Sequence, residues 1–101
     1  MLKIIKVTGN SLSPFFLPGD FVLVNTFYRQ FKNLKKNDSV VFEHPEYGQL
    51  IKFIDKNYPD SEILKVTGSH KDSISSHKLG LIPYSALIGR VIFHIRQPRS
   101  V

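Results

Sequence analysis

Apolar and polar residues alternate in short runs along most of the chain, and turn residues separate the runs. Six runs rich in β-branched, leucine or aromatic residues occupy residues 3–7, 21–25, 39–44, 49–55, 62–68 and 90–96. Alternation with a period of two over such lengths is typical of half-buried strands. Pro, Gly, Asn and Asp gather between the runs, as in PEYG at 45–48. The pattern predicts a mostly β protein with a compact, twisted and partly closed antiparallel, barrel-like fold.

Two places favour a single helical turn in place of a strand. Pro14 and Pro18 exclude a long helix from the segment SLSPFFLPGD, because each proline removes a donor and restricts the residue before it. One turn at residues 11–16 is compatible with both prolines. The segment PYSAL at 83–87 begins with proline, which is favoured at the first position of a helix. Short helical turns are therefore expected beside the strands.

Length and composition place the chain among single-domain globular proteins. It has 101 residues, 42% of them hydrophobic and 22% charged, which predicts one domain over residues 1–101. The absence of cysteine excludes disulfides, thiolate catalysis and cysteine-based zinc sites, and it fits a reducing compartment. The sequence shows neither an apolar run of membrane-spanning length nor a signal-peptide pattern. We therefore expect a cytoplasmic protein without a transmembrane segment.

The net charge of +6 admits three partner classes, namely nucleic acid, a membrane surface or an acidic protein. The basic residues are scattered apart from two clusters, KNLKKN at 32–37 and RQPRS at 96–100. Neither cluster is interleaved with aromatic residues as in a single-strand binding groove. Both clusters are therefore interpreted as solvated faces, and no nucleic-acid partner is expected.

The four histidines do not form a metal-binding pattern. None has the H-x-x-x-H spacing, and no HExxH-like motif is present. His94 alternates within a strand and is interpreted as a structural residue. We expect neither a metal site nor a cofactor, while a Ser-His-Asp triad is left open by the sequence.

Lys52 and Ser11 are the residues with the most chemical interest. Lys52 lies in the middle of the apolar run LIKFI, and the strand pattern alone favours an outward, half-exposed side chain. If Lys52 instead points inward with Leu50 and Ile54, desolvation lowers its pKa, and the neutral amine can act as a base. Ser11 lies between a glycine-containing turn and two prolines, in a loop that could present one hydroxyl. A neutral amine can take the proton of such a hydroxyl, so a serine–lysine pair needs no histidine.

Three segments in order resemble the boxes of the type I signal peptidase and LexA-like family of serine-lysine peptidases. GNSLSPFFLPGDFVLVN resembles the nucleophile box, with Ser11 on the nucleophile and Leu12 in place of the usual methionine. QLIKFI resembles the box of the general base, with Lys52 on that lysine. GSHKDSISSHKLGLIP resembles the third box, in which Ser76 falls on the serine that helps to orient the lysine. The closing LIGRVIF also matches a strand of the family.

The resemblance implies roles for further residues, and the chain departs from the family at several positions. Gly9 stands where some members have a serine, which implies an oxyanion hole formed by backbone N–H groups or with help from Asn10. The resemblance and the apolar run also indicate a substrate cleft at Leu12, Pro14 and Phe15. The third box is eroded at Ser69, His70, Ser75 and His77, where the family has Asp, Asn, Asp and Arg.

The branch of the family is inferred from the ten residues that precede Ser11, which favour a stand-alone catalytic core. Such a core is similar to the nickel-type superoxide dismutase maturation proteases. That similarity implies a serine endopeptidase whose partner is a precursor protein with an extended N-terminal segment. Two alternatives stay open: a signal-peptidase-like enzyme that contacts a membrane surface, and a non-catalytic basic β module, which the eroded third box favours.

Overall fold

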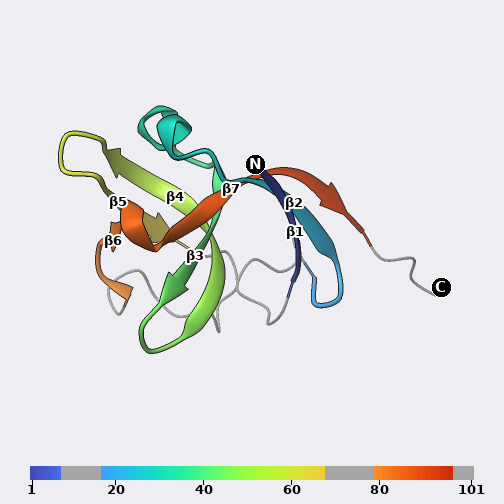
Figure 1. Ribbon diagram of the computed structural model, residues 1–101. Helices are drawn as coiled ribbons and strands as arrows, with labels where there is room; N and C mark the ends of the chain where they lie inside the picture. The colour runs from blue at the N-terminus through green and yellow to red at the C-terminus, as the bar shows by residue number, and fades with distance from the viewer. Residues whose placement is uncertain (8–16, 68–78, 97–101) are drawn as a thin grey trace.

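The computed structural model describes residues 1–7, 17–67 and 79–96, and gives only the backbone for residues 28–30 (Figure 1). The strands in these ranges are β1 (Leu2–Lys6), β2 (Phe21–Asn25), β3 (Ser39–His44), β4 (Gly48–Tyr58), β5 (Ile63–Thr67), β6 (Ile82–Pro83) and β7 (Leu87–Ile95). Two short 3-10 helices accompany them, η1 (Tyr28–Asn33) and η2 (Tyr84–Ala86). The predicted turn in PYSAL is confirmed as η2, whereas the turn predicted at 11–16 lies outside the described residues.

The strands form one antiparallel sheet in the order β1-β2-β7-β3-β4-β5-β6. Every described strand pair is antiparallel, and β1 and β6 are the two edges, so these strands do not close on themselves. The predicted mostly β, antiparallel fold is confirmed. Figure 1 shows β7 passing through the centre of the molecule, between the β1–β2 end and the β3–β6 end.

Gly89 lets the two ends of the sheet meet on β7. The first part of β7 pairs with β3, where Gly89 is opposite Val41, and its last part pairs with β2. A Cβ atom added at Gly89 would lie 2.6 Å from Cγ1 of Val24 and would collide with the carbonyl oxygen of Asn25. A side chain at this position would therefore push β2 away from β7.

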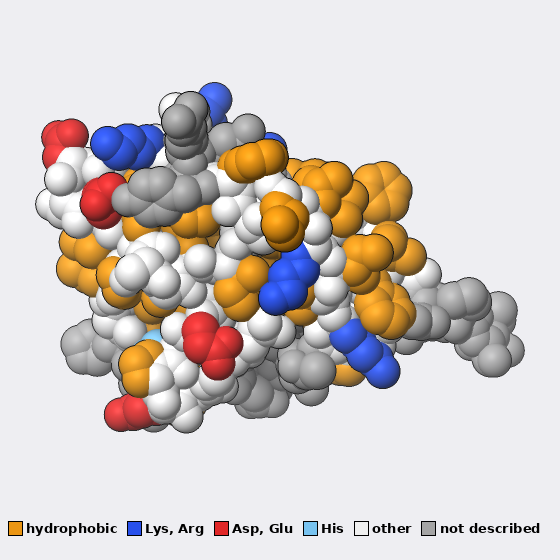
Figure 2. Space-filling view, in the orientation of Figure 1, with side chains coloured by type: hydrophobic (Ala, Val, Ile, Leu, Met, Phe, Trp, Pro, Cys, Tyr) orange, Lys and Arg blue, Asp and Glu red, His pale blue; other side chains and the backbone are white. Residues whose placement is uncertain are grey.

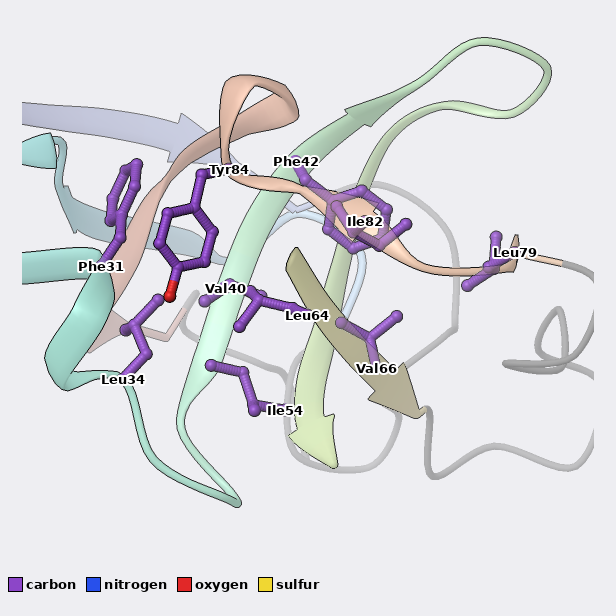
Figure 3. Close-up of a cluster of buried hydrophobic side chains, with 10 residues drawn as sticks. All are labelled: Phe31, Leu34, Val40, Phe42, Ile54, Leu64, Val66, Leu79, Ile82 and Tyr84. Atoms are coloured by element: carbon purple, nitrogen blue, oxygen red, sulfur yellow. The ribbon is translucent and has the colours of Figure 1, made fainter. Parts of the chain in front are cut away.

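The first hydrophobic cluster lies at the β3–β6 end, where η1 and η2 cover one face of the sheet (Figure 3). Its buried members are Phe31, Leu34, Val40, Phe42, Ile54, Leu64, Val66, Leu79, Ile82 and Tyr84. The rings of Phe31 and Tyr84 meet edge to face, with their centroids 5.8 Å apart. This cluster forms the larger part of the described core.

The second hydrophobic cluster lies between the β1–β2 end and the middle of the sheet. It contains Ile5, Val7, Val22, Val24, Val41 and Ile51. β3 and β4 contribute to both clusters, because alternate residues of a strand point to opposite faces. These two strands are therefore covered on both faces.

Four features of the fold were not expected from the sequence. β4 extends to Tyr58, β6 forms at Ile82–Pro83, β7 begins at Leu87, and η1 forms at residues 28–33. The end of η1 is held by a distant side chain, since the Asn57 amide donates at 3.0 Å to the carbonyls of Phe31 and Leu34. Such long-range bonds leave no signal in the local pattern.

Candidate functional site

Lys52 lies in the middle of β4, which is paired with β3 and β5 and packs against a hydrophobic cluster on each face of the sheet. It shares a face with Leu50 and Ile54, and its cross-strand partner is Val40 of β3. The Lys52 side chain belongs to that inner face and is 0% exposed. In the middle of β4 both faces are covered, so the position of Lys52 is not open to solvent, whereas Lys56 farther along the strand is exposed.

Burial lowers the pKa of the Lys52 amine from its ordinary value of 10.5. The cause is desolvation, which penalises the charged ammonium form more than the neutral amine. The outward orientation that the strand pattern alone favoured is therefore wrong, and the inward alternative is correct. The chemical consequence is that Lys52 holds its proton less tightly than an exposed lysine does.

The two ends of the segment that contains Ser11 are held together by backbone hydrogen bonds. The Val7 N–H donates to the Asp20 carbonyl at 2.7 Å, and the Gly19 N–H donates to the Val7 carbonyl at 3.0 Å. Gly19 adopts a φ of 92°, a conformation that favours glycine in the turn before β2. The described residues on either side of positions 8–16 are therefore anchored to each other.

The Asp20 carboxylate completes this anchor. Its Oδ2 accepts a hydrogen bond from the Leu17 N–H at 3.2 Å and lies 2.8 Å from Nε2 of His94. The Asp20 residue is 1% exposed, which is unusual for a carboxylate without specific partners. His94 therefore has a defined hydrogen-bond partner in the structure. Such a partner is what the interpretation of His94 as a structural residue requires.

The sequence signal for Asp20 and His94 was weak. In the sequence, Asp20 is only the last residue of the segment SLSPFFLPGD, and His94 is interpreted only as a structural residue within a strand. Nothing in the local pattern links two residues that lie 74 positions apart.

Among the residues that the sequence assigned to the site, Lys52 is the one that the structure describes. The remaining ones lie outside the described residues, namely Gly9, Asn10, Ser11, Leu12, Pro14, Phe15 and Ser76.

The described histidines are engaged in structural contacts. His44 accepts a hydrogen bond from the Glu46 N–H at 3.1 Å through Nδ1, and its Nε2 lies 3.3 Å from the Leu79 carbonyl. Within residues 1–7, 17–67 and 79–96, no three His, Asp or Glu side chains gather as metal ligands would. The helices in those same ranges are all too short to cross a bilayer.

Comparison with known proteins connects this geometry to a family. Residues 1–65, which include Ser11 and Lys52, match the family model described as signal peptidase, peptidase S26. The chain is also similar to signal peptidase I V of Bacillus subtilis (strain 168), with 43% identity over 47 residues. That alignment covers 46% of this chain and 28% of the Bacillus protein, so the chain spans under a third of that relative. The family match extends over more than half of the chain, and the chain therefore belongs to the signal peptidase family, peptidase S26.

Proposed function

We propose that the protein is a serine endopeptidase in which Ser11 is the nucleophile and Lys52 the general base. The observation that carries this proposal is the fully buried Lys52 side chain with its lowered pKa. Membership in the signal peptidase family supports a serine peptidase in general. A lowered pKa favours the neutral amine, which can act as a base without the help of a histidine.

The proposed reaction proceeds through an acyl-enzyme. The Lys52 amine takes the proton of the Ser11 hydroxyl while the oxygen attacks the scissile carbonyl carbon. The peptide C–N bond then breaks, and the Lys52 ammonium returns the proton to the leaving amine. Water hydrolyses the ester with the same amine as base, which frees Ser11. Gly9 and Asn10 would support the oxyanion, and Ser76 would orient the lysine.

The proposed substrate is a precursor protein that loses its N-terminal propeptide. We take the precursor of nickel superoxide dismutase as the first candidate, because the sequence resembles the maturation proteases of that enzyme. An extended propeptide can add a strand to a sheet edge, a common mode of peptide recognition. The cysteine-free sequence supports a cytoplasmic setting for this processing.

Cleavage of the nickel superoxide dismutase precursor, followed by mass spectrometry, tests this proposal. Wild type should release one defined N-terminal peptide, and Ser11→Ala and Lys52→Ala should both abolish that release. Lys65→Ala is the matched control, because Lys65 is an exposed lysine on the neighbouring strand β5. Cleavage that survives in Ser11→Ala would contradict the dyad. A wild type without activity, combined with salt-sensitive binding of nucleic acid, would favour the basic binding module.

A second candidate function, peptidase action at a membrane surface, is favoured by one face of the β1–β2–β7 end. Ile4 of β1, Leu23 of β2 and Phe93 of β7 are cross-strand partners in one row. Ile4 and Phe93 are each 62% exposed, and Leu2 and Ile95 are also exposed. The opposite face of the same strands buries the second cluster. Figure 2 shows hydrophobic side chains gathered at this end of the molecule, with Lys or Arg side chains beside them.

Such an apolar face with cations beside it fits an anionic bilayer surface. Co-sedimentation with vesicles of phosphatidylglycerol and phosphatidylcholine tests this candidate. Wild type should sediment with the vesicles, and the double variant Ile4→Ser, Phe93→Ser should remain in solution. Leu81→Ser is the control, because Leu81 is 53% exposed but lies before the edge strand β6. Equal sedimentation of all three proteins would reject the membrane-surface role of this face.

A further inference from the structure

We propose that Asp20 and His94 are a positioning pair that fixes the nucleophile segment, residues 8–16, relative to β7. This inference rests on the proposed function, since it gives the pair a role in presenting Ser11. It assigns neither residue to the chemical step itself.

Asp20 connects three parts of the chain, two through its carboxylate and one through its backbone carbonyl. Its Oδ2 accepts from the Leu17 N–H at 3.2 Å, directly after the nucleophile segment, and meets Nε2 of His94 at 2.8 Å. The backbone of the same residue accepts from the Val7 N–H at 2.7 Å, directly before that segment. One residue therefore holds both ends of the segment, and His94 holds that residue from β7.

The strand register explains why His94 can reach this place. His94 is the cross-strand partner of Val22 on β2, two residues beyond Asp20. β7 also pairs with β3, which in turn pairs with the strand that carries Lys52. The His94–Asp20 bond therefore holds the residues that flank the nucleophile segment, Val7 and Leu17, to the same strand that pairs with the neighbour of β4.

The geometry argues for positioning rather than for a Ser-His-Asp triad. In such a triad the histidine presents Nε2 to the serine and Nδ1 to the carboxylate. Here Nε2 is the atom that meets Asp20, and the carboxylate is 1% exposed. A misplacement of about 1 Å at a nucleophile can reduce the rate roughly 100-fold, so an anchor outside the chemistry can still set kcat.

Three variants test the pair by precursor cleavage. His94→Leu removes the donor to Asp20 and should lower kcat roughly 10- to 100-fold with little change in KM, as expected for a misplaced nucleophile. His94→Gln keeps an N–H donor at similar reach and should recover most of the rate. Tyr84→Phe is the control, because it removes a different, partly buried hydrogen bond. The hydroxyl of Tyr84, which belongs to the first cluster, donates at 2.6 Å to Asn57. The control should leave kcat unchanged even if it lowers stability.

Amide hydrogen exchange of Leu17 and Gly19 gives a readout that does not depend on cleavage. Exchange at both amides should be at least about tenfold faster in His94→Leu than in wild type, and unchanged in Tyr84→Phe. Unchanged exchange in His94→Leu would overturn the anchor. Faster exchange with an unchanged kcat would overturn the positioning role and leave the proposed peptidase intact. A wild type that does not cleave the precursor would overturn both the proposed peptidase and the positioning role. This outcome is distinct from unchanged exchange and from faster exchange with an unchanged kcat.

Discussion

β4 and β5 each carry a lysine inside an apolar run, but the lysine on β4 is buried and the lysine on β5 is exposed. Lys52 in Leu50–Ile54 is 0% exposed, whereas the Lys65 side chain in Ile63–Val66 is 49% exposed. Lys65 lies opposite Lys56 and places its Nζ 3.7 Å from Oδ2 of Asp55. The local sequences are alike, so the run of apolar neighbours does not determine which lysine is buried.

The difference comes from the number of covered faces. β5 buries Leu64 and Val66 in the first cluster and leaves the alternate positions to solvent. β4 gives Ile54 to the first cluster and Ile51 to the second. A lysine at position 65 of β5 can therefore point outward, while a lysine at position 52, where both faces of β4 are covered, is desolvated. Lys56, farther along β4, is exposed. Such an unfavourable position suits a residue that needs a lowered pKa for its function.

The largest effect should come from replacing each lysine by arginine. Lys52→Arg keeps the positive charge but supplies a group that does not deprotonate, so precursor cleavage should fall by on the order of 10⁴-fold. Lys65→Arg keeps an exposed cation beside Asp55 and should leave the rate unchanged. Single-turnover cleavage, with circular dichroism to confirm folding, measures both. Substantial activity in Lys52→Arg would mean that another group is the base.

A smaller effect is expected on stability when each lysine becomes methionine. Lys52→Met removes a buried amine and should raise the free energy of unfolding by about 1–3 kcal/mol at neutral pH. At pH values below the lowered pKa of Lys52 in the folded protein, Lys52 is protonated in both the folded and the unfolded chain. Folding then carries the whole free-energy cost of burying the charge. Between that pKa and 10.5 the unfolded chain binds more protons, so wild-type stability rises with pH and the advantage of Lys52→Met shrinks. Urea unfolding at several pH values measures this, and a pH-independent difference would contradict the desolvation.

The smallest effect on stability should come from Lys65, the exposed lysine of the two. Lys65→Met breaks the contact with Asp55, and a pair with both side chains substantially exposed contributes at most about 1 kcal/mol. We expect a change in the free energy of unfolding within about 0.5 kcal/mol, which should diminish further at high salt. The same urea experiment measures it. A loss comparable to that of a core substitution would show that Lys65 is not solvated.

The two lysines also show how far the sequence predicts this molecule. Alternation and turn residues identified most of the strands, because the inner face of each strand must be apolar. The orientation of Lys52 required the pairing of Lys52 with Val40 and the coverage of both faces, which are tertiary facts. The hydrogen bond between Asp20 and His94 could not be predicted from the sequence for the same reason. Ser11 and Lys52 are candidates from their neighbouring residues and from the resemblance of three segments to a family, and only Lys52 of the two falls within the described residues.

The central claim is that burial in the folded protein lowers the pKa of Lys52, as its proposed role as the general base requires. NMR of the protein with ¹³C-labelled lysine, following each Cε resonance through a pH titration, tests it most directly. Lys52→Met identifies the resonance by removing it. We predict that this resonance titrates with a midpoint below 10.5, in line with the burial of the amine. A midpoint at or above 10.5 would contradict the claim, because Lys52 would then remain charged and could not accept the Ser11 proton.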